Sequence, residues 1–131
     1  MATSSLITEQ GAIDVSFPSS GDLSSHQYKA MVLDSSEEVA LAGANAKVFG
    51  ILQNAPSAQG ETARLRIQGV SKLIVAEAVT TGKFITSTAA GLGEVCDAAN
   101  EEYFCVAMGD FATSDHAEVI IARGEVTASD A

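Results

Sequence analysis

Two segments of this chain, about 55 residues apart, carry nearly the same pattern. The first begins at Lys47 as Lys-Val-Phe-Gly-Ile-Leu and continues, after a loop of small residues, into the alternating run 63–69. The second begins at Glu102 as Glu-Tyr-Phe-Cys-Val-Ala and continues, after a similar loop, into the run 117–124. Phe49 and Phe104 are 55 positions apart, as are the two glycines that close the runs. Two copies of a strand, loop, strand unit predict a duplicated β framework.

The length and composition suit a single domain whose core is made of small residues. A chain of 131 residues buries about 65 to 70% of the surface that its unfolded form exposes, so it can form a stable core without disulfide bonds or structural metal ions. The chain is 47% hydrophobic but only 5% aromatic and has no tryptophan. Small and β-branched side chains of this kind favour pleated sheets.

Short apolar runs follow one another from Tyr28 onward, separated by turn signals about 8 to 12 residues apart, which is typical of sandwiches and barrels. In the clearest run, 62–69, Ala63, Leu65 and Ile67 alternate with polar residues, so one face is expected in a core. We therefore predict an all-β fold, a small sandwich or barrel-like domain built from two similar strand-loop-strand repeats. The expected strands are 28–33, 38–42, 46–53, 62–69, 72–76, 84–87, 92–96, 103–109 and 117–123.

Composition divides the chain into three parts. Residues 1–26 contain seven serines and no lysine or arginine, which predicts an extended N-terminal arm. The β domain is expected over 27–125, and 126–131 are expected to form a frayed C-terminal tail.

The arm also carries apolar residues that a simple tail would not need. Ile13, Val15 and Phe17 alternate with polar residues at strand period, and Leu6 and Ile7 form a second apolar spot. We expect these five residues to form a protein interface, with the arm added as a strand to a neighbouring subunit or another protein surface. The alternative is that the arm folds back on its own domain as an edge strand.

The charge of the chain excludes some partners. Its formal net charge is −10, from 17 acidic and 7 basic residues, so its field repels nucleic acid and anionic membranes. No signal peptide or membrane-spanning apolar stretch is evident, which predicts synthesis in the cytoplasm. Arg64 and Arg66 share one face of their strand, where they can receive carboxylates from a neighbouring subunit or pair with acids on the next strand of their own sheet.

No residue pattern predicts catalysis, a cofactor or a metal site. His26 and His116 are 90 residues apart and belong to no metal-binding motif, and the neighbours Asp115 and His116 would point to opposite faces of a strand. The doublets Glu37-Glu38 and Glu101-Glu102 precede strands and are interpreted as solvated turn charge. Cys96 and Cys105 lack zinc-site spacing and are expected as buried free thiols, the alternative being a bridge between neighbouring strands.

The segment from about Tyr28 to Gly124 resembles the small capsid decoration, or cement, proteins of tailed bacteriophages. The segments that carry the resemblance are Gly50-Ile51-Leu52-Gln53-Asn54, Gly69-Val70-Ser71-Lys72, Gly82-Lys83-Phe84-Ile85, Gly91-Leu92-Gly93-Glu94-Val95 and Val106-Ala107-Met108. The resemblance departs from the family pattern after Gly82 and at Cys105.

This resemblance implies a structural virion protein without enzymatic activity or cofactor. Such a protein binds the major capsid protein on the outside of an icosahedral head, as a homotrimer that bridges capsomers and stabilises the shell. It would be found on the capsid exterior, and in the host cytoplasm during assembly. The alternatives are another phage structural subunit, from a tail tube or spike, or a small β-fold enzyme whose site is assembled from distant residues.

Overall fold

The computed structural model describes residues 11–126, in which every regular element is a β-strand. The all-β prediction is therefore confirmed, and each of the nine predicted ranges overlaps an observed strand. The additional strand is β1, which lies in the segment predicted as an arm. The strands are β1 (Ile13–Pro18), β2 (Ala30–Leu33), β3 (Val39–Leu41), β4 (Gly50–Leu52), β5 (Thr62–Gln68), β6 (Val70–Ile74), β7 (Phe84–Ser87), β8 (Gly93–Val95), β9 (Glu102–Ala107) and β10 (His116–Glu125).

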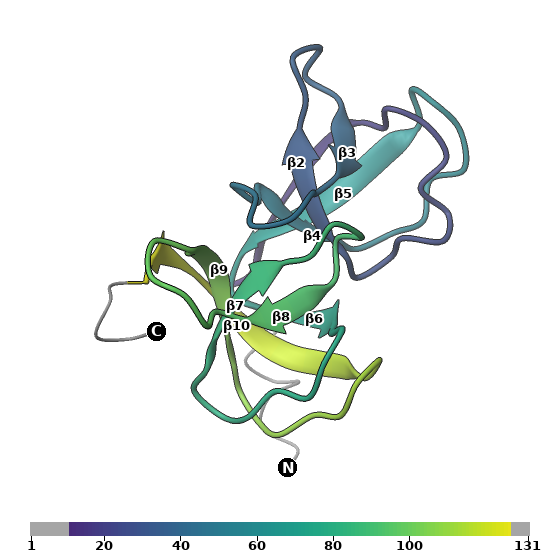
Figure 1. The fold of residues 1–131 in the computed structure, drawn as a ribbon. Coiled ribbons are helices and arrows are strands. Elements are labelled where there is room, and N and C mark those ends of the chain that lie inside the picture. Colours follow the sequence, from purple (N-terminus) through teal and green to yellow (C-terminus); the bar gives the residue numbers. More distant parts are fainter. Residues whose placement is uncertain (1–10, 127–131) are drawn as a thin grey trace.

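The strands form two five-stranded antiparallel sheets with the same internal order. The first sheet runs β1-β5-β4-β2-β3 and the second β6-β10-β9-β7-β8, so adding five to each label converts one into the other. Figure 1 shows the first sheet, in purple to teal, above the second, which runs from the teal of β6 to the yellow of β10. Parallel bridges from Ser19 to Val39 and from Val75 to Gly93 bring the outer strands of each sheet together, which makes each half barrel-like.

The two sheets also share their register. Ile51 of β4 lies opposite Arg66 of β5 in the first sheet, and Val106 of β9 lies opposite Ile120 of β10 in the second. Equivalent residues of the halves are thus separated by 54 to 56 positions throughout. We call residues 11–69 the first half and residues 70–126 the second half. The unit that repeats in the structure is a whole five-stranded sheet, which is larger than the strand, loop, strand unit visible in the sequence.

Each half has an apolar interior that follows from strand alternation. Ala63 and Leu65 of β5 are fully buried in the first half, and Ile67 packs against the same cluster, whereas Arg64 and Arg66 point away. The second half has a larger cluster, built on residues such as Leu73, Ile85 and Val119. Four residues of the first half also belong to this second cluster: Ala30, Ala42, Val48 and Ile51. The halves therefore pack directly against each other.

The connection between the halves is a single residue, Gly69, between the end of β5 and the start of β6. Its φ of 99° is a left-handed conformation, and a Cβ at this position would lie 2.9 Å from Ala12 Cα, so only glycine fits. Hydrogen bonds also cross between the halves: Ala30 N donates to Gly91 O at 2.8 Å, and Ile74 N donates to Tyr28 O at 2.9 Å. The relative position of the sheets is thus held by packing, hydrogen bonds and a tight turn.

Candidate protein-binding surfaces

The structure places two of the predicted interface residues in the protein's own first half. β1 pairs antiparallel with β5, with Val15 opposite Leu65 and Phe17 opposite Ala63. Both side chains pack against the first-half cluster, and the Phe17 ring meets Phe49 edge to face at 5.7 Å. The segment therefore folds back on its own domain as an edge strand, which was the alternative prediction. The physical reason is that β5 provides backbone groups for β1 to pair with and an apolar face for Val15 and Phe17 to cover.

The remaining predicted apolar residues have other positions. Ile13, at the start of β1, is 44% exposed and is one of the large apolar side chains on the described surface. Leu6 and Ile7 lie outside the described residues. Of the alternating run, Ile13 is therefore the residue that still offers apolar surface to another molecule.

Arg64 and Arg66 form a charged cluster with Asp14 of the adjacent strand. Arg64 Nη1 donates to Asp14 Oδ2 at 2.7 Å, and Arg66 Nε donates to Asp14 Oδ1 at 2.8 Å. Hydrogen bonds from Arg66 lower the pKa of Asp14 most, and those from Arg64 add to the effect, although partial burial opposes them. Arg66 Nη1 also donates to Val70 O of the second half at 3.1 Å. The arginines are therefore paired within the chain, the alternative that involved an acid on the next strand.

β1 presents a free strand edge. One edge pairs with β5, and within residues 11–126 no strand pairs with the other edge of Ile13–Pro18, although Ser19, directly after β1, bridges to Val39 of β3. A shallow hollow of about 220 Å³ lies at the end of β1 on its β5 side, lined by Ser16, Phe17, Pro18, Gly60 and Thr62. Unpaired backbone groups of this kind can receive an added strand, and Pro18, which lacks an N–H, limits that pairing to the residues before it.

A second surface lies on the outer face of the second sheet. Phe84, Val106, Ile120 and Val70 lie opposite one another across β7, β9, β10 and β6, so their side chains share one face. Ile120 is 43% exposed, Phe84 and Val106 are half-buried, and the Phe84 ring stacks on Tyr103 at 4.3 Å. We call Phe84, Tyr103, Val106 and Ile120 the open face. Sequence alternation alone could not find it, because β9 and β10 each read as strands with two apolar faces.

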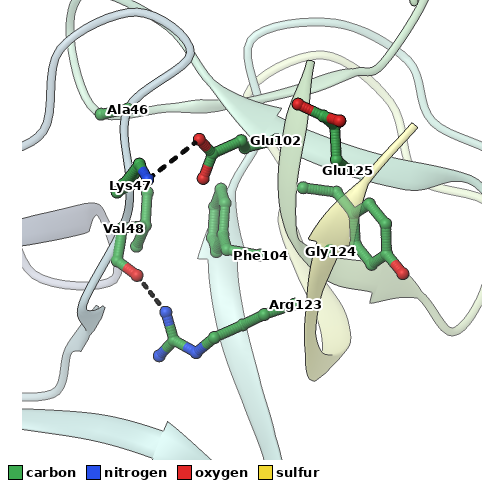
Figure 2. Close-up of a pocket in the computed structure, with 9 residues that line it drawn as sticks. Ala46, Lys47, Val48, Glu102, Phe104, Arg123, Gly124 and Glu125 are labelled. Carbon is green, nitrogen blue, oxygen red and sulfur yellow. Dashed lines mark hydrogen bonds and ion pairs between the residues drawn. The ribbon is translucent and has the colours of Figure 1, made fainter. Parts of the chain in front are cut away.

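Next to the open face is a hollow of about 530 Å³, where loop 46–48 of the first half meets β9 and β10 (Figure 2). Lys47 Nζ lies 3.7 Å from Glu102 Oε2 at its rim, and both side chains are solvated, so this ion pair contributes little. The Arg123 guanidinium donates to the carbonyl oxygens of Val48 and Phe49. Burial lowers the pKa of Arg123, and the charge is compensated by these two carbonyls. The hollow is therefore better explained as a seam between the halves than as a catalytic cleft.

The side chains that could take part in acid–base, nucleophilic or metal chemistry do not lie close together. His116 is exposed and lies edge-on to Tyr28 at 5.6 Å, and the His26 Nδ1 atom is 3.2 Å from Lys29 Nζ. Cys96 and Cys105 are free buried thiols whose pKa is raised by desolvation, to about 12 for Cys96. Among residues 11–126 no cluster of three histidine, cysteine or acidic side chains is arranged to hold a metal ion. In the same range no helix is long and apolar enough to cross a membrane.

Comparison with known proteins shows a likeness of fold. No family model matches the chain, and no curated protein matches its sequence. Among solved structures, the N base of the head fiber protein gp8.5 of bacteriophage phi29 has a similar structure, with a TM-score of 0.63. The two sequences are 14% identical, and the superposition covers 87% of this chain and 98% of that one. At this identity the likeness establishes a shared fold.

Proposed function

We propose that this protein is a structural component of a tailed-phage virion and decorates the outside of the head. The observation that carries the proposal is the likeness of fold, over nearly the whole of both chains, to a protein described as the base of a phage head fiber. The resemblance of the sequence to capsid decoration proteins supports it independently. The acidic surface adds solubility, which a protein made in many copies requires.

The proposed attachment uses the N-terminal side of the first half. Ile13 is exposed where the described chain begins, the β1 edge is free beside it, and Leu6 and Ile7 precede it in the sequence. Burial of three such side chains on the major capsid protein would contribute on the order of 1.5 to 3 kcal/mol each, before the cost of ordering the segment. A homotrimer at a threefold position would engage three such segments at once, which makes dissociation slow.

The test is binding to heads that lack the protein. Heads from a phage with this gene deleted are mixed with purified protein, and the bound fraction is measured after sedimentation. The informative variant lacks residues 1–10 only, since a deletion that extends to residue 20 would remove β1 and disturb the first sheet. We expect the full chain to bind, and the truncated chain to bind at least about tenfold more weakly.

Two outcomes contradict parts of the proposal. A full-length protein that ignores the heads would reject the decoration function, and assembly into sixfold rings that stack would indicate a tail-tube subunit instead. Truncated protein that binds as tightly as the full chain would reject the N-terminal attachment. Substitution Ile13→Lys is the matched point variant, because it alters one exposed side chain and leaves β1 in place.

A further inference from the structure

Because the two halves share a fold, the outer face of the first sheet can be compared with the equivalent face of the second sheet. In the first half, Ala30, Ala42, Val48 and Ile51 are almost fully buried, because they pack into the cluster of the second half. Strand order and register assign counterparts to Ala30 and Ile51. Ala42 N donates to Ala30 O as Cys96 N donates to Phe84 O, which assigns the counterpart of Ala42, and the 55-residue spacing carried two residues before β4 assigns that of Val48. In the same order, the counterparts are Phe84, Cys96, Tyr103 and Val106.

The counterparts are apolar or aromatic, yet three of them stay half-exposed. Phe84, Tyr103 and Val106 are only partly buried, although they occupy positions that are covered in the first half. The counterpart of Arg66 is Ile120, at 43% exposure, whereas the Arg66 side chain is 14% exposed and donates to Val70 of the second half. The second half thus carries the face by which the first half is joined to it, and within residues 11–126 the side chains of Phe84, Tyr103, Val106 and Ile120 on this face stay partly exposed.

We propose that a second copy of this chain covers the open face with its first half, so that copies associate head to tail. The chain itself supports this choice of occupant, because the first half already packs this same face against a unit of the same fold. Repetition of that contact between chains is heterologous, and such contacts form a ring when the rotation closes. The inference concerns the protein alone and does not depend on its binding to a phage head.

The turn that would make the contact has the required shape. Within the chain, the β7–β8 turn of the second half lies on the first half, where Gly91 O accepts from Ala30 N and where a Cβ on Gly91 would clash with Leu41. The equivalent β2–β3 turn has Glu37 at the position of Gly91, with φ of 63° against 75°. In the proposed contact, the β2–β3 turn of one copy lies on Phe84 and Val95 of another. Val95 is the counterpart of Leu41 and lacks its Cδ atoms, which leaves room for the Cβ of Glu37.

Charge opposes this contact and provides a sharp test of it. Asp34, Glu37 and Glu38 lie in or next to the β2–β3 turn, and the open face borders Glu94, which has several acidic neighbours. Lys83 is the basic residue adjacent to Phe84. Because like charges approach each other, association should tighten as salt screens them. The substitution Glu37→Lys should also tighten it, and this substitution acts on the first half without altering the open face.

The experiment is sedimentation equilibrium of the full chain from low micromolar to near-millimolar concentration, at low and high salt. We expect association that strengthens with salt, and Ile120→Lys should weaken it at least about tenfold. Ile13→Lys is the matched control, since Ile13 is the same residue with nearly the same exposure, 44% against 43%, and lies outside the open face. Both positions are exposed, so both variants should fold, which thermal unfolding verifies.

Several outcomes overturn the proposal. They are a protein that stays monomeric throughout, association that Ile120→Lys leaves unchanged, and association that Glu37→Lys weakens. A full chain that stays monomeric while a variant without residues 1–10 associates would assign the open face to the N-terminal segment. A protein that binds phage heads as a monomer would reject this inference and the proposed homotrimer but leave head decoration intact. Rings that ignore phage heads would support this inference and reject head decoration.

Discussion

Glu37 occupies a backbone conformation that favours glycine, and replacing it should stabilise the protein. Its φ is 63°, and the equivalent position of the second half is Gly91. The left-handed conformation costs a residue with a Cβ about 1 to 2 kcal/mol. Glycine avoids this cost but destabilises the folded protein by about 0.5 to 1 kcal/mol, because it increases the entropy of the unfolded chain. The expected net gain for Glu37→Gly is therefore about 0.5 to 1 kcal/mol in the free energy of unfolding.

The measurement is urea unfolding at 25 °C followed by far-ultraviolet circular dichroism, because the chain has no tryptophan to report by fluorescence. For a chain of this length the gain corresponds to an increase in melting temperature of about 2 to 4 °C. Glu37→Ala is the control, since it removes the carboxylate and keeps the Cβ. If the alanine and glycine variants gain equally, the effect comes from charge and the backbone argument is wrong.

A reciprocal change tests the same reasoning from the other side. Gly82 has φ of 84°, and a Cβ built there would meet nothing within 4 Å, so Gly82→Ala introduces strain without a clash. We expect a loss of about 0.5 to 1 kcal/mol, similar in size to the gain at Glu37 and opposite in sign. A neutral Gly82→Ala variant would contradict the assumed cost of the left-handed conformation.

Three further predictions concern ionisable groups. Arg66 and Arg64 hold the pKa of Asp14 below 3.8. The ionised carboxylate therefore stabilises the fold above that pH, and this contribution is lost as the pH falls through the lowered pKa. Asp14→Asn should remove this part of the acid sensitivity, which is measured as the melting temperature between pH 2 and 7. Burial raises the pKa of Glu94 most, and its acidic neighbours raise it further, so the charged form of this side chain opposes folding at neutral pH. Glu94→Gln should therefore raise the melting temperature at pH 7 and leave it unchanged at pH 3, where the carboxyl group is protonated. Both thiols are buried with raised pKa values, so a thiol reagent at pH 8 should label neither Cys96 nor Cys105 in the native protein and both in urea, and rapid native labelling would contradict the buried positions.

Local sequence patterns were sufficient for the elements but could not decide their partners. Alternation in 62–69 placed Ala63, Leu65 and Ile67 on a core face, and the structure confirms this, because strand periodicity is a property of neighbouring residues. The same alternation in Ile13, Val15 and Phe17 was compatible with a strand added to another protein or to its own sheet. Only the position of β5, some fifty residues away, determined that β1 belongs to its own domain.

The candidate surfaces depended even more on the tertiary structure. That Arg64 and Arg66 lie on one face follows from their spacing, whereas their pairing with Asp14 requires the β1–β5 register. The sequence indicated a repeat, but nothing in it says that the first half buries a face which the second half leaves open. Periodicity determines which side chains share a face, and the long-range packing of one sheet on the other determines which faces remain in contact with water.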